Sequence, residues 1–118
     1  MKFNFEDLQV YQKSVDLVDA VYLTSRQFPK EEIYGLTSQF RRAVLSISLN
    51  ISEGSGGTKK EFLRFLRTAS NSLKECIVCI TVAKRQNFLS TKEHDELREK
   101  LVEISKMISG LKKYLLKD

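Results

Sequence analysis

TKKEFLRFLRTASNSLKECIVCITVAK, residues 58–84, is the stretch that decides the fold. Its apolar residues recur at alternating steps of three and four, which keeps their side chains on one stripe of an α-helix. The opening Thr58 and the following Glu61 are typical of a capping box, in which each side chain accepts a hydrogen bond from the other residue's backbone N–H. The stretch predicts a long amphipathic helix with this buried stripe: Phe62, Leu66, Ala69, Leu73, Cys76, Ile80 and Ala83.

Three other segments repeat this spacing, so we expect helices near 5–27, 31–53, 59–86 and 91–116. The breaks are short: Pro29, the Gly54-Ser55-Gly56-Gly57 run, and Ser90, which opens a second capping box. Connections this short force neighbouring helices to run antiparallel, and an average step of about 3.5 residues favours left-handed packing. The predicted fold is all-α, an antiparallel up-down-up-down left-handed four-helix bundle that forms a single domain over residues 1–118.

The composition of the 118-residue chain fits one globular domain, with 42% hydrophobic and 30% charged residues. One proline and five glycines are too few for a β-sandwich or barrel. The N-terminus carries acids where a signal peptide would be apolar, and no apolar run approaches the ~18 residues of a membrane span. We therefore expect a cytoplasmic protein that does not insert into a membrane.

Recognisable catalytic or metal-binding patterns are missing from the sequence. His94 is the only histidine, which excludes a multi-histidine metal site. Cys76 and Cys79 match a redox motif by letter, but they lie in the middle of a predicted helix, whereas redox cysteines lie at a helix N-terminus. We interpret them as buried structural thiols and expect no enzyme activity, no metal and no cofactor.

Two helices carry a second apolar face. On the first helix we expect the core stripe to be Leu8, Tyr11, Val15, Val18 and Tyr22. An isolated bundle buries one stripe per helix, so the additional apolar residues predict self-association. The alternative is that they only widen the core contact. The expected oligomer interface consists of Val10, Leu17, Val21, Phe28, Leu45 and Leu49.

A polar stripe follows the second helix along Gln39, Arg42, Ser46, Asn50 and Glu53. Polar groups beside two apolar faces are partly buried and need hydrogen-bond partners, so a structural network is the leading interpretation. A small-ligand site is the alternative.

A basic stripe on the third helix is the candidate binding surface. Residues 58–88 carry seven Lys or Arg against two Asp or Glu and hold nearly the whole excess of a chain with net charge +5. Opposite the apolar stripe, this helix presents Lys60, Arg64, Arg67, Asn71 and Lys74. Such cations suit salt-dependent contacts with phosphates, although a solvated helix face is the alternative. No aromatic residue interleaves with them, so stacking on single-stranded bases is not indicated.

Three motifs lie between the end of the first predicted helix and the end of the second: Phe28-Pro29-Lys30-Glu31-Glu32-Ile33-Tyr34-Gly35-Leu36, Gln39-Phe40-Arg41-Arg42-Ala43 and Ser46-Ile47-Ser48-Leu49-Asn50-Ile51-Ser52-Glu53-Gly54. They resemble the bacterial four-helix-bundle family of 23S rRNA intervening-sequence proteins, also called S23-like. The resemblance covers essentially the whole chain and departs at Asn71, where a glycine is expected. It implies a pentameric ring and marks Arg41, Arg42, Asn50 and Glu53 as signature residues. The family is also similar to the accessory variability proteins of diversity-generating retroelements, which engage nucleic acid and a reverse transcriptase.

Together, the charge and the resemblance predict a non-enzymatic homo-oligomeric scaffold, a pentamer, that binds nucleic acid and in particular RNA, with DNA as the other candidate. The alternative is a protein-interaction adaptor without direct nucleic-acid binding, whose partner would be a reverse transcriptase or another protein.

Overall fold

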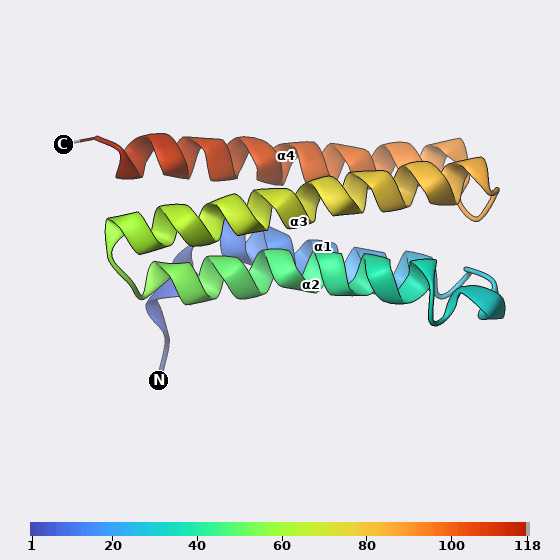
Figure 1. Ribbon diagram of the computed structural model, residues 1–118, viewed down its shortest axis with the longest axis horizontal. Helices are drawn as coiled ribbons and strands as arrows, with labels where there is room; N and C mark the ends of the chain where they lie inside the picture. Colours follow the sequence, from blue (N-terminus) through green and yellow to red (C-terminus); the bar gives the residue numbers. More distant parts are fainter. Residues whose placement is uncertain (118) are drawn as a thin grey trace.

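Four long helices make up the computed structural model, which describes residues 1–117 (Figure 1). They are α1 (Gln9–Ser25), α2 (Leu36–Ser55), α3 (Lys59–Arg85) and α4 (Thr91–Leu115), with short 3-10 helices η1 (Asn4–Asp7) and η2 (Lys30–Glu32). The described residues contain no strand, and the molecule measures 47 × 27 × 20 Å. The predicted all-α four-helix fold is confirmed.

The helices pack around the bundle in chain order: α1 contacts α2 and α4, and α3 contacts α2 and α4. Cross-helix hydrogen bonds show the antiparallel course of α1 and α2, because Ser14 meets Ser48 whereas the later Ser25 meets the earlier Arg41. In Figure 1, α3 and α4 lie above α1 and α2, and both chain ends lie at the same end of the bundle.

The core contains the predicted stripe of α3 without exception, and the α4 residues Leu97, Leu101, Ile104 and Ile108 are buried with it. On α2, Phe40, Val44, Ile47 and Ile51 are fully buried. Burial of these side chains is the main favourable term in folding the bundle.

The buried face of α1 differs from the predicted one. Leu17 and Val21 are 1% and 0% exposed, and Val10 and Phe28 are also buried, whereas Tyr22 of the expected core stripe is 39% exposed. The assignment of Val10, Leu17, Val21 and Phe28 to an oligomer interface is therefore wrong, because side chains buried within one chain cannot contact a second copy.

Two serines explain why the sequence pattern was misleading on α1. Ser14 and Ser25 interrupt the buried apolar stripe, yet both are buried with it. Ser14 donates to the Tyr11 carbonyl (2.6 Å) and shares a 2.8 Å hydrogen bond with Ser48, so its hydroxyl enters the core fully satisfied.

Helix α2 begins at Leu36, five residues later than predicted. Gly35 precedes it with φ −114° and ψ −114°, outside the helical region. Glu32 lies in the preceding turn, and its carboxylate accepts the Leu36 N–H (3.1 Å), so this acid caps the helix from outside its first turn. Ile33 lies in the turn and is 56% exposed.

Both predicted capping boxes are present. Thr58 Oγ1 accepts a hydrogen bond from the Glu61 N–H, and the Glu61 carboxylate accepts one from the Thr58 N–H, both at 3.1 Å. Ser90 and Glu93 form the same pair at the start of α4. These caps fix where α3 and α4 begin, and burial of the apolar stripe of α3 turns its basic residues outward.

Candidate nucleic-acid interface

Helix α3 presents a basic ridge, defined here as Lys60, Arg64, Arg67, Asn71 and Lys74. All five side chains are exposed. They step by four, three, four and three residues, so they follow one line on the side opposite the buried stripe. The ridge extends from Lys60 to Lys74, 15 residues, whose 14 steps correspond to about 21 Å at ~1.5 Å per residue.

The cations of the ridge are not neutralised by carboxylates of residues 1–117. The ion pairs in this part of the chain are Lys2–Asp7, Lys13–Glu103 and His94–Asp95, all away from the ridge. Neither acid of α3 forms an ion pair with the ridge. Glu61 belongs to the capping box, where the hydrogen bond from the Thr58 N–H and, less strongly, the charge of Arg64 lower its pKa. Glu75 accepts a 3.3 Å hydrogen bond from Gln39 of α2. The ridge therefore offers free positive charge to an anionic partner.

Lys112 of α4 extends this basic surface, and sequence reasoning missed it. Its Nζ donates to Ser70 Oγ of α3 at 3.4 Å. Ser70 lies three residues after Arg67 and four before Lys74, so the three α3 residues share one side of the helix. Lys112 was not identified from the sequence because residues 89–118 carry nearly equal numbers of acidic and basic residues. A helical projection of α4 would have placed Lys112 on a different side from its acids.

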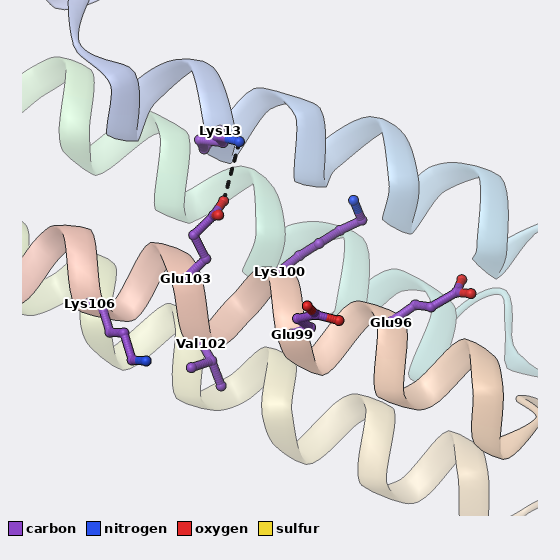
Figure 2. A pocket seen from close by; sticks show the side chains of 7 residues that line it. All are labelled: Lys13, Glu96, Glu99, Lys100, Val102, Glu103 and Lys106. Atoms are coloured by element: carbon purple, nitrogen blue, oxygen red, sulfur yellow. Dashed lines mark ion pairs between the residues drawn. The ribbon is translucent and has the colours of Figure 1, made fainter.

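The acids of α4 lie on its other side, toward α1. A shallow groove between these helices is lined by Lys13, Glu96, Glu99, Lys100, Val102, Glu103 and Lys106. Figure 2 shows Lys13 reaching across from α1 to Glu103, with 3.4 Å between Nζ and Oε1. Its lining alternates in sign and therefore selects no ligand of one charge.

Three residues of the polar stripe of α2 make hydrogen bonds with α3 or within α2, namely Gln39, Ser46 and Asn50. Ser46 Oγ accepts from both Ser72 Oγ (2.8 Å) and Asn50 Nδ2 (3.0 Å). Gln39 and Arg42 line a small hollow beside this pair, together with Glu75, and Glu53 is exposed near the end of the helix.

Arg41 differs from its neighbours because it turns toward α1. Its Nε donates to Ser25 Oγ at 2.9 Å, and its guanidinium lies 4.7 Å from the centre of the Tyr22 ring. The signature residues thus lie at two helix contacts, Arg41 at α1–α2 and Arg42 at α2–α3.

The two cysteines lie in the core. Burial raises the pKa of Cys76 to about 12 and that of Cys79 to about 11. Both thiols stay protonated at neutral pH and are weak nucleophiles. Residues 1–117 contain no group of three His, Cys, Asp or Glu side chains placed to hold a metal, and no described helix is long and apolar enough to cross a membrane.

The fold and the ridge together define a small all-α bundle with one basic helix face. Residues 6–110 match the model of the 23S rRNA-intervening sequence protein family, and the chain belongs to this family. A solved structure with the same fold is a protein of unknown function from the S23 ribosomal protein family of Bacteroides thetaiotaomicron VPI-5482. Its TM-score is 0.79 at 21% identity, covering 88% of this chain and 98% of that one. No curated protein matches the chain.

Proposed function

We propose that this protein is a non-enzymatic, homo-oligomeric scaffold that binds RNA through the basic ridge. The observation that carries the proposal is a line of exposed cations on one rigid helix, free of ion pairs with residues 1–117. Such a line matches a phosphate backbone, whose contacts supply sequence-independent affinity. The family description, which refers to 23S rRNA, favours RNA over DNA. The proposal places the protein in the cytoplasm.

Self-association multiplies the effect of a modest charge. Each copy carries only +5, but an assembly presents several ridges to one polyanion. The number five rests on the family resemblance. The candidate interface is the outer face of α1 and α2, defined as Tyr22, Leu45 and Leu49. Leu45 and Leu49 are 41% and 50% exposed.

Binding to a structured RNA, measured by fluorescence anisotropy over a range of salt concentrations, tests the proposal. We expect the logarithm of affinity to fall linearly with the logarithm of salt concentration. The double variant Arg64→Ala/Arg67→Ala should reduce the slope by about two, because each lost phosphate contact accounts for about one. The control Arg26→Ala/Lys30→Ala removes two exposed cations elsewhere and should leave the slope unchanged.

Equal slopes for the two double variants would overturn the proposal. A protein partner that stays bound after nuclease treatment, together with absent RNA binding at low salt, would favour the adaptor function instead.

A further inference from the structure

We propose that the ligand of this surface is double-helical RNA, held at the seam between α3 and α4, with Arg67 and Lys74 on one phosphate strand and Lys112 on the other. The inference rests on the proposed function and specifies which form of RNA the protein binds.

The first step is the convergence of cations from two helices. Lys112 is fixed over the seam by its hydrogen bond to Ser70, directly beside Arg67 and Lys74. Packed helices lie about 8–10 Å apart, and Lys112 reaches across this distance to place its Nζ 3.4 Å from Ser70 Oγ, so both helices supply cations to one surface. Cations that converge from two helices can contact phosphates on both strands that border a groove.

The second step is the placement of three acids of α4. Glu96, Glu99 and Glu103 line the groove toward α1 together with Lys100 and Lys106, and Glu103 pairs with Lys13 there (Figure 2). Lys112 instead meets α3. Because these acids are drawn to the α1 side, the α3–α4 seam can approach two phosphate strands without like-charge repulsion.

The third step excludes a single strand. Proteins that bind single-stranded RNA stack its bases on exposed aromatic rings. The ridge contacts one aromatic ring, Phe65, which is partly buried, with the Arg64 guanidinium 4.6 Å from its centre. Tyr114 of α4 is 68% exposed but lies two residues from Lys112 and so on another side of that helix. The ridge thus offers charge and rigid shape without an open ring of its own, which suits duplex RNA.

The test compares an RNA duplex of about 16 base pairs with its separated strands by fluorescence anisotropy, at ~0.1 M salt. We expect the duplex to bind more tightly than either strand. Lys112→Ala should weaken duplex binding roughly five- to tenfold and lower the salt slope by about one. Lys106→Ala, which removes the same charge from the α1 side of the same helix, should change affinity less than about twofold. Lys112→Arg should retain binding.

Strands that bind as tightly as the duplex, or equal effects of Lys112→Ala and Lys106→Ala, would overturn the inference. If Arg64→Ala/Arg67→Ala still weakens RNA binding in that case, the proposed function stands and only the duplex assignment fails. If neither the ridge variant nor Lys112→Ala affects binding, both fail.

Discussion

Gly54 lies where α2 packs closely against α3. A Cβ at this position would lie 2.7 Å from Phe65 Cβ and 2.8 Å from Phe62 Cδ1. Gly54→Ala gains up to about 1 kcal/mol of helix propensity but forces overpacking that costs about 1–3 kcal/mol. We expect a lower free energy of unfolding, measured by urea denaturation.

Gly110 provides the matched control, because a Cβ there meets nothing within 4 Å. Gly110→Ala lies in the exposed interior of α4 and should raise the free energy of unfolding by roughly 0.5–1 kcal/mol. If the two alanine variants were equally stable, the close packing at Gly54 would not affect the free energy of unfolding.

Glu93 makes the stability of the start of α4 depend on pH. The Ser90 backbone N–H and the Gln27 side chain donate to its carboxylate, both at 2.9 Å, and hold the pKa of Glu93 below its ordinary value of 4.5. A pKa lowered by folding contributes stability above the unfolded-state pKa, and this contribution is lost as pH falls through the folded-state pKa. Wild type should therefore exceed Glu93→Gln in urea midpoint near pH 7, and the difference should shrink below about pH 4.5.

Glu99→Gln is the control for this pH effect, since Glu99 is an exposed acid of the same helix outside the capping box. The difference in urea midpoint between Glu99→Gln and wild type should vary less with pH than the difference for Glu93→Gln. A Glu93→Gln difference that stays constant down to about pH 3 would contradict the role assigned to the carboxylate.

At the scale of the helices, the α2–α3 pair is joined more firmly than the α1–α4 pair. The first has the close contact at Gly54 and the Ser46–Ser72 hydrogen bond. The ion pair across the second, Lys13–Glu103, is about half exposed, and such pairs contribute only about 0–1 kcal/mol. Hydrogen exchange followed by mass spectrometry should therefore show slower exchange in α2 and α3 than in α1. Equal protection of α1 and α3 would refute this order.

The helices themselves could be predicted from the sequence because their signals are local. The apolar spacing and capping box of α3 depend on residues within a few positions of one another, and the structure matches them to within one residue at the helix end. The same spacing also predicted correctly that the ridge is exposed.

The buried face of α1 and the contribution of Lys112 could not be predicted this way, because both depend on a neighbouring helix. Ser14 is acceptable in the core only because Ser48 of α2 meets it. Lys112 joins the ridge only because α4 lies beside Ser70. Periodicity ranks faces by apolar content, so it assigned the uninterrupted stripe of α1 to the core and the stripe that contains two satisfied serines to an oligomer interface.

For the whole molecule, the outer face of α1 and α2 should control assembly. We expect Leu45→Lys/Leu49→Lys to lower the mass measured by light scattering while the helices stay folded, because both side chains are largely exposed in one copy. Leu17→Ala should do the reverse: it should cost about 2–5 kcal/mol of unfolding free energy and leave the assembly mass unchanged. A wild-type protein that is monomeric at micromolar concentration would refute the assembly.

The uneven distribution of charge has a kinetic consequence. The ridge and Lys112 put positive charge on the α3–α4 side, whereas the groove between α1 and α4 is lined by equal numbers of lysines and glutamates, so the molecule has an electric dipole across its short dimensions in addition to its net charge. A polyanion would exert a torque on this dipole before contact and rotate the α3–α4 side toward itself. Added salt should therefore slow association more than it hastens dissociation, and a uniformly charged bundle of the same net charge would be captured less efficiently.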